Sequence, residues 1–193
     1  MTFYKYASLW CAPRGSLALL VAAALVGPAT GWAQSDAAAG AAPSQARQPL
    51  PFTFTGRVTR VFDGDTLWVK PLAGGRYRKL RLDGVDAPEI CQSGGPAARD
   101  ALAVRVLDQV VTVRVRAFDT YGRGLAQVSA GGDDMAAVLV RGGHAWSSRW
   151  RRSLGPYAAE EAQARAERKG VFGVDGAETP REFRRRHGPC SLP

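Results

Sequence analysis

Apolar and polar residues alternate along four stretches of the chain in the way that β-strands require. The clearest stretch places Val111, Val113 and Val115 on one face with threonine and arginine between them, which is the pattern of a strand with one buried side. The turn-forming pair Asp63-Gly64 divides the first stretch, so we expect about five strands in all. The four stretches are 52–71, 76–82, 110–118 and 124–130.

Helical periodicity replaces this alternation in three further segments. The first begins at a Gly-Pro pair, with proline in the first turn, and places Ala98, Leu102 and Val106 on one face. The second follows a capping residue, Asp133 or Asp134, and ends before two glycines. The three predicted helices run from Gly95 to about Gln109, over 135–141, and from Pro156 to Gly170.

The order of these elements predicts an α+β fold that is mainly β. Five short antiparallel strands with about three helices at their ends are compatible with a small oligonucleotide-binding type barrel, although strand spacing alone does not prove closure. We place this domain at residues 52–174. Residues 34–51 lack any apolar period and are expected to form a flexible linker. The basic tail, 175–193, is expected to be irregular and pinned to the domain at intervals.

The first 33 residues have the features of a secretory signal peptide. Lys5 and Arg14 precede an apolar run at 17–26, and Gly31 and Ala33 sit three and one positions before a suitable cleavage point. An uncleaved anchor is the alternative, but a Gly-Pro pair breaks the short run, whereas a spanning helix needs about 20 apolar residues. We expect a monomer, periplasmic or secreted, without stable membrane association once it is mature.

The charge of the chain narrows the choice of partner. Lys and Arg number 26 against 17 Asp and Glu, so the net charge is +9 and the pI is about 10.1. The excess stays with the mature protein, because the first 33 residues contain two basic residues and no acidic ones. Most of the basic residues are arginine, whose planar side chain pairs bidentately with phosphate. We expect an anionic partner, either nucleic acid or a membrane surface.

Three short segments concentrate carboxylates and arginines. Asp65 and Asp86 each stand next to a strand and could give two carboxylates to one hard cation such as Ca²⁺, with Glu89 following closely. Arg81 and Arg123 are suited to hold a phosphate that the cation polarises. The combination predicts metal-assisted cleavage of phosphodiester bonds. The segments are DGDT at 63–66, RLDGVDAPE at 81–89 and DTYGRG at 119–124.

We assign no chemical role to two further aspartates and to the two histidines of the chain. Asp63 and Asp83 precede glycine and are interpreted as turn residues, because aspartate commonly supports such a bend through its side chain. His144 and His187 lack a neighbouring nucleophile or metal-ligand spacing. A histidine-based nuclease is therefore disfavoured.

In this order and spacing, the three segments resemble the motifs of the thermonuclease family, whose best-known member is staphylococcal nuclease. The similarity spans about residues 56–173 and includes the Gly95-Pro96 helix start and the AVLVRGG helix end. The resemblance implies an oligonucleotide-binding barrel and a calcium-dependent phosphodiesterase, a thermonuclease-like endonuclease. It further implies hydrolysis of DNA and RNA at the bond to the 5′ oxygen, which leaves 3′-phosphate ends.

The resemblance also assigns a metal site and a base. Asp65 and Asp86 match the family's calcium carboxylates. Ala87 stands where the family gives a backbone carbonyl to the ion, usually from threonine, and a carbonyl survives that change. Glu89 matches the residue that orients or deprotonates the attacking water.

The remaining matches concern the substrate. Arg81 and Arg123 match the two arginines that hold the phosphate and neutralise the transition state, and Tyr121 matches a nucleotide-contacting tyrosine. The family's other pocket tyrosines are not matched. This chain offers Trp146 and Trp150 instead, which we interpret as core residues, while the arginines within 149–152 could extend an electrostatic track for the nucleic-acid backbone.

A nucleic-acid-binding barrel whose catalysis has lapsed is the alternative to an enzyme. Acidic groups beside a polyanion weaken its binding, so a pure binding protein has no reason to keep them. The set Asp65, Arg81, Asp86, Glu89 and Arg123 therefore favours the nuclease. A membrane-surface role is a distant third.

The cysteines suggest a covalent link to the tail. Cys11 leaves with the signal peptide, and the remaining pair, Cys91 and Cys190, favours a disulfide in an exported protein. Two free thiols and a metal pair are the alternatives, although no CxxC spacing or nearby histidine completes a zinc site. A bridge would bring the arginines at 184–186 toward the active site, where they could add phosphate contacts.

Overall fold

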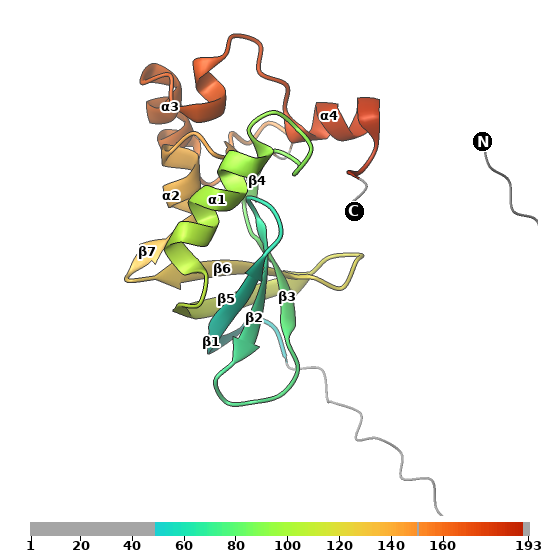
Figure 1. Cartoon of the computed structure of the whole chain (residues 1–193), viewed down its shortest axis with the longest axis vertical. Coiled ribbons are helices and arrows are strands. Elements are labelled where there is room, and N and C mark those ends of the chain that lie inside the picture. The colour runs from blue at the N-terminus through green and yellow to red at the C-terminus, as the bar shows by residue number, and fades with distance from the viewer. Residues whose placement is uncertain (1–48, 150, 191–193) are drawn as a thin grey trace, which may run out of the picture. The chain divides into compact units, whose positions relative to one another are not determined.

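The structure, a computed structural model, describes residues 49–149 and 151–190, and its strands form a five-stranded barrel (Figure 1). The strands pair in the order β3-β2-β1-β5-β6, and β3 also pairs in parallel with β6, which closes the barrel. The predicted mainly-β α+β barrel is confirmed. Its strands are β1 (Phe52–Val61), β2 (Thr66–Pro71), β3 (Arg78–Leu82), β5 (Val110–Phe118) and β6 (Gly124–Ala130).

The alternation seen along the chain produces the barrel core. Val111, Val113 and Val115 of β5 are at most 1% exposed, whereas the threonine and arginine residues between them are exposed. Leu80 and Leu82 of β3 are buried in the same core. Each such side chain contributes about 1.5–3 kcal/mol by leaving water, so the polar faces of these strands must point outward.

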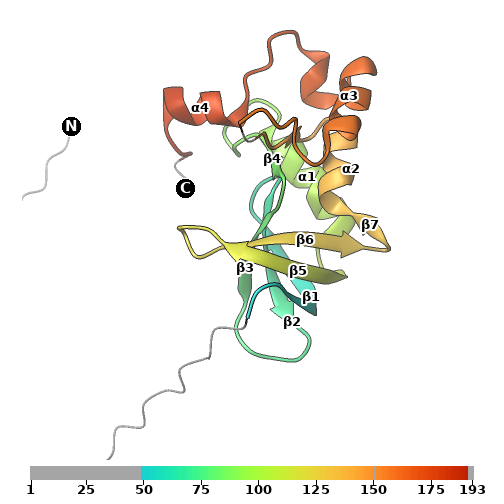
Figure 2. The same cartoon turned by 180° about the vertical axis from the view of Figure 1, so that it is seen from behind.

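The helices gather at one end of the barrel (Figure 2). The first, α1, buries Ala98, Leu102 and Val106 as predicted but ends before Gln109, because the backbone turns extended at Leu107, with ψ at 131°, and left-handed at Asp108. The cap of α2 is Asp134, whose side chain accepts a hydrogen bond from the backbone of the second residue of that helix. The helices are α1 (Gly95–Val106), α2 (Met135–Arg141), α3 (Ala158–Ala166) and the 3₁₀ turn η1 (Gly170–Gly173).

Two short strands between the barrel and the helices fix the end of one acidic segment. β4 (Val85–Asp86) pairs with β8 (Trp146–Ser147), with Asp86 opposite Trp146. The buried carboxylate of Glu161 on α3 accepts a hydrogen bond of 2.9 Å from the backbone N–H of Ser147. The backbone of Asp86 is thus held by α3 through β8. One further strand, β7 (Asp133–Asp134), pairs antiparallel with the end of β6.

The prediction of an irregular tail is wrong, because Pro180–His187 forms a fourth helix, α4. Thr179 and Glu182 form a capping box, in which each side chain bonds the backbone N–H of the other residue, and proline opens the helix. This signal, threonine followed three residues later by glutamate with proline between, was present in the sequence. In Figures 1 and 2, α4 lies beside the loop that leads into α1.

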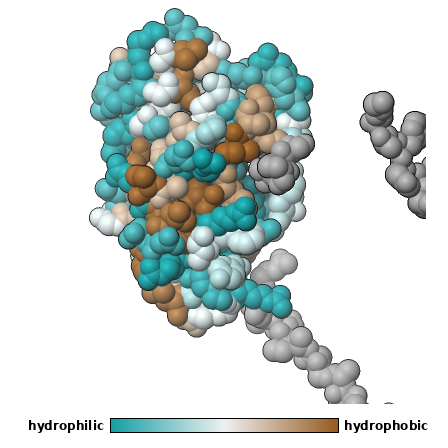
Figure 3. Space-filling model, viewed as in Figure 1, coloured by the Kyte–Doolittle hydropathy of each residue, from teal (hydrophilic) through white to brown (hydrophobic). Residues whose placement is uncertain are grey.

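On the face drawn in Figure 3, polar side chains divide the hydrophobic areas from one another. Within 49–149 and 151–190, the helices are too short or too polar to cross a membrane. The predicted signal peptide and most of the linker lie outside the described residues and stay predictions.

Candidate active site

Asp65 stands in the turn between β1 and β2, with its carboxylate buried. Asp63 supports this turn by accepting a hydrogen bond of 2.9 Å from the backbone N–H of Asp65, which agrees with its interpretation as a turn residue. Oδ1 of Asp65 accepts from the hydroxyl of Thr66 at 3.0 Å, and Oδ2 accepts from the backbone N–H of Ala87 at 3.0 Å. These bonds hold the carboxylate against the segment that carries the second acidic residue.

Arg81 joins the two aspartates. Its side chain projects from β3, where Arg81 pairs with Thr66 of β2, and it donates through Nη1 to Oδ1 of Asp65 at 2.8 Å. Its other terminal nitrogen, Nη2, donates to Oδ1 of Asp86 at 2.7 Å. One guanidinium therefore spans both carboxylates, which places them on either side of a single positive group.

Glu89 lies in the loop between β4 and α1, and this loop is held tightly. The backbone N–H of Glu89 donates to the side-chain oxygen of Gln92 at 3.1 Å. Gly95, the first residue of α1, approaches so closely that a Cβ there would lie 2.0 Å from the carbonyl oxygen of Glu89. Any larger residue at this helix start would clash with the backbone of Glu89, so the loop would have to shift.

The third segment places Arg123 directly before β6. Its Nε donates to Oδ2 of Asp119 at 2.8 Å, and its backbone N–H donates to Oδ1 at 2.9 Å. The aspartate therefore fixes the orientation of the arginine side chain. Nη1 of Arg123 reaches the hydroxyl of Thr66 at 3.4 Å, beside Asp65. Tyr121, in the same turn, is 82% exposed, and the guanidinium carbon of Arg123 lies 5.4 Å from the centre of its ring.

These segments meet around one cavity of about 420 Å³. The predicted residues at its wall come from the three sequence motifs and are Asp65, Arg81, Ala87, Glu89, Tyr121 and Arg123. Asp86 is joined to this wall by its contact with Arg81. Residues from Asp65 to Arg123, which are 58 positions apart in the chain, are thus brought together at one cavity.

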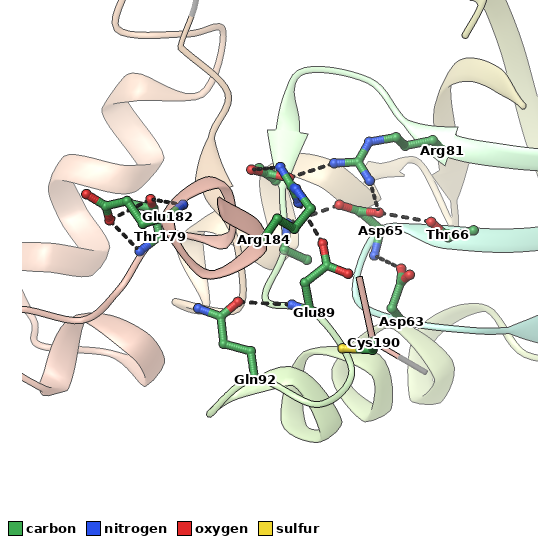
Figure 4. Close-up of polar contacts among 12 residues, drawn as sticks. Asp63, Asp65, Thr66, Arg81, Glu89, Gln92, Thr179, Glu182, Arg184 and Cys190 are labelled. Atoms are coloured by element: carbon green, nitrogen blue, oxygen red, sulfur yellow. Dashed lines mark hydrogen bonds and ion pairs between the residues drawn. The ribbon is translucent and has the colours of Figure 1, made fainter. Parts of the chain in front are cut away.

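Arg184 of α4 also lines this cavity, and Figure 4 shows it reaching toward Glu89 from the side opposite Arg81. Its Nη1 donates to Oε1 of Glu89 at 2.6 Å, and its two terminal nitrogens contact the two carboxylate oxygens of Asp86 at 3.3 and 3.2 Å. The expectation that tail arginines approach the site is met by Arg184. Arg186 instead pairs with Glu178.

A disulfide between Cys91 and Cys190 holds the end of α4 at the site, with a Cα–Cα distance of 5.8 Å. The other end of the tail segment is held by Gln92, whose side-chain Nε2 donates to the carbonyl of Glu178 at 2.7 Å. The tail is therefore fastened on both sides of Arg184 to the loop that carries Glu89.

Burial dominates the electrostatics of Asp65. Loss of water around this carboxyl raises its pKa to about 7, against the opposing attraction of Arg81. At Asp119, burial also acts to raise the pKa, but the hydrogen bonds from Arg123 outweigh it, and the pKa lies below its usual value. Asp119 therefore stays charged beside Arg123, while Asp65 takes up a proton more readily.

Several residues named from the sequence lie away from this cavity. Trp146 is 6% exposed and packs edge-on against Phe172, as expected of a core residue, whereas Trp150 lies outside the described residues. Arg149 pairs with the buried Glu161, the residue that accepts a hydrogen bond from β8. His144 lines a different cavity, and burial lowers its pKa.

The closed five-stranded barrel is an oligonucleotide-binding type fold, and its cavity holds a site in which carboxylates are paired with arginines. A sequence model of the family described as "Staphylococcal nuclease homologue" matches residues 79–173. The micrococcal nuclease of Shigella flexneri is 35% identical over 145 residues, which cover 68% of this chain and 81% of that protein. The chain belongs to the staphylococcal nuclease homologue family.

Other relatives are similar over comparable lengths. Protein ParB of Escherichia coli is 33% identical over 165 residues, covering 80% of this chain and 92% of that protein. An uncharacterized endonuclease of Escherichia coli O157:H7 is 34% identical over 118 residues, covering 61% and 76%. These matches agree with the family that the motifs resemble.

Proposed function

We propose that this protein is an exported, calcium-dependent nuclease that hydrolyses DNA and RNA and leaves 3′-phosphate ends. Membership of a nuclease family supports hydrolysis of nucleic acid. The observation that carries the proposal is the pairing of Asp65 and Asp86 by one arginine, Arg81, at a cavity that also holds Glu89 and Arg123. Few binding proteins would keep so many carboxylates where a polyanion must approach.

The donors at this cavity suit a hard divalent cation. Asp65, Asp86 and the backbone carbonyl of Ala87 offer oxygen ligands only, which is the chemistry that calcium prefers. Among the described residues, no group of three or more acidic, histidine or cysteine side chains is arranged to hold an ion. The aspartates are paired with arginines instead, so the site already accommodates positive charge between its carboxylates.

The residues then divide the chemistry. A bound calcium ion would supply polarisation of the phosphodiester. Glu89 accepts a proton from a water whose oxygen bonds to phosphorus, while the bond to the 5′ oxygen breaks and that oxygen takes a proton from solvent. Arg81 and Arg123 hold the phosphate oxygens and neutralise the charge that grows on them. Tyr121 offers an exposed ring to the sugar or base.

Purified protein starting at Gln34 is expected to cleave single-stranded DNA and RNA with calcium and to lose cleavage when EGTA removes the ion. The products should resist extension by a polymerase until a phosphatase has removed their 3′-phosphate. Cleavage that EGTA leaves unchanged would contradict the calcium requirement. Products with 3′-hydroxyl ends would contradict the proposed bond of attack.

The second candidate function is a nucleic-acid-binding barrel without catalysis. The observation in its favour is that Arg184 occupies the carboxylates of Asp86 and Glu89, which then are not open to a cation or a water. Tight binding of oligonucleotides without any cleavage, with calcium present in excess, would support this candidate over the nuclease.

Export is expected to remove the first 33 residues, so the mature amino terminus should be Gln34 or lie within a few residues of it. The reason is the pattern of basic, apolar and small residues that signal peptidases recognise. Mass spectrometry of the protein from a bacterial envelope fraction measures this directly. Recovery of the chain with Met1 intact from the cytoplasmic fraction would refute export.

A further inference from the structure

We propose that Arg184 is a tethered counter-charge that calcium must displace from Asp86, so that the tail helix α4 sets the calcium affinity of the site. This inference rests on the proposed function, because it needs Asp86 to be a calcium ligand. It adds to the site a residue from outside the three sequence motifs, and it gives the disulfide the role of holding that residue near Asp86.

The contacts of Asp86 leave neither carboxylate oxygen without an arginine donor. Oδ1 accepts from Nη2 of Arg81 at 2.7 Å and from Nη1 of Arg184 at 3.3 Å, while Oδ2 accepts from Nη2 of Arg184 at 3.2 Å. A calcium ion binds carboxylate oxygens directly at 2.3–2.6 Å, which these donors obstruct. Arg81 touches only one of the two oxygens, so Arg184 is the group that closes the second.

Glu89 strengthens the hold on the same arginine. Its Oε1 accepts from Nη1 of Arg184 at 2.6 Å, the shortest contact of that guanidinium. The side chains of Asp86 and Glu89 are 18% and 22% exposed, and that of Arg184 is 38% exposed, so solvent screens these pairs only in part. Burial opposes the charge on Arg184, yet the two carboxylates outweigh it and keep its pKa above the usual value.

The tether makes this competition effective. Cys190 lies six residues after Arg184 and is bonded to Cys91, which lies two residues after Glu89. Before the arginine, Thr179 and Glu182 fix the start of α4, and Gln92 holds the carbonyl of Glu178. A group fastened in this way competes at an effective concentration of about millimolar or more, whatever the protein concentration.

Calorimetric titration of calcium into substrate-free protein tests the proposal. Arg184→Ala is expected to bind calcium about tenfold more tightly than the natural chain, because the ion no longer has to break charge-assisted hydrogen bonds to Asp86. Arg184→Lys should lie between them, since lysine keeps the charge but cannot contact two oxygens as a fork.

Arg185→Ala is the matched control. It removes the same charge from the same helix, and Arg185 is exposed and does not line the cavity. Its dissociation constant for calcium should stay within about twofold of that of the natural chain, because solvent screens such exposed charges. If both substitutions change the calcium affinity equally, Arg184 acts only through the net charge of the helix, and the proposal is overturned.

Two further results separate this proposal from the proposed function. Equal calcium affinity of the natural chain and Arg184→Ala, or weaker binding by the variant, would overturn the counter-charge and leave the calcium site standing. Absence of calcium binding in every variant, Arg184→Ala included, would overturn the calcium site itself and the inference with it.

Discussion

Glu89→Gln and Arg123→Ala are each expected to lower the rate of DNA cleavage at saturating calcium by about a hundredfold to ten-thousandfold. Glutamine has the shape of glutamate but cannot accept the proton of the attacking water. Alanine at 123 removes the guanidinium that lies 3.4 Å from the hydroxyl of Thr66 and faces the cavity. Rates measured with a fluorescent single-stranded oligonucleotide, with calcium varied to ensure saturation, check both changes.

The barrel offers a matched control for the arginine. Arg116 forks onto Asp83 at 2.7 and 2.9 Å, much as Arg123 pairs with Asp119, but it lies outside the cavity. Arg116→Ala should therefore cleave at a rate close to that of the natural chain. Near-normal cleavage by Glu89→Gln or Arg123→Ala, in protein with an unchanged melting temperature, would refute the role of that residue.

Loss of the disulfide, by Cys91→Ser together with Cys190→Ser, is expected to lower the free energy of unfolding by up to about 4 to 5 kcal/mol. The bridge joins residues 99 positions apart, and closing so long a loop removes much freedom from the unfolded chain. At roughly 2–4 °C per kcal/mol for a protein of this size, the melting temperature should fall by up to about 8 to 20 °C. Differential scanning calorimetry measures the shift.

The same variant should also release the tail. α4 has eight residues, whereas an isolated helix needs about 12–15 to be stable in water, so its contacts with the domain, with the bridge among them, keep it formed. Brief trypsin treatment should then cut at the arginines of 181–186 before it cuts the barrel. The control is natural protein in which peptide mapping has shown the disulfide. If the double variant melts at the same temperature as this control, the account is contradicted.

The barrel and its site differ in how far local pattern predicts them. The strands follow from alternation such as that of Val111, Val113 and Val115, because a residue's neighbours two positions away share its face. Helix ends were less accurate, since the backbone leaves the helix at Leu107 and Asp108, and the helical pattern gives no sign of this. The tail helix was missed although its capping box was legible.

The site residues were predicted because each motif carries its own chemistry over a few positions. Asp65, Arg81 and Glu89 could be proposed from carboxylates and arginines near turns and strand ends, with the family resemblance assigning their roles. Their mutual contacts could not, since the hydrogen bond from Arg81 to Asp65 depends on the pairing of β2 with β3. The sequence likewise did not show which arginine pairs with which carboxylate at the cavity.

The sequence alone therefore determined the barrel strands, the presence of the first three helices, the motifs and the pair of cysteines, because periodicity and turn chemistry act between residues close together in the chain. Only the tertiary structure decided what the tail does. Its arginines were expected beside a phosphate, yet Arg184 meets Asp86 and Glu89, residues 98 and 95 positions away. Which charge meets which at that separation depends on where the packed barrel, α1 and the disulfide place the end of α4, and no local pattern encodes that position.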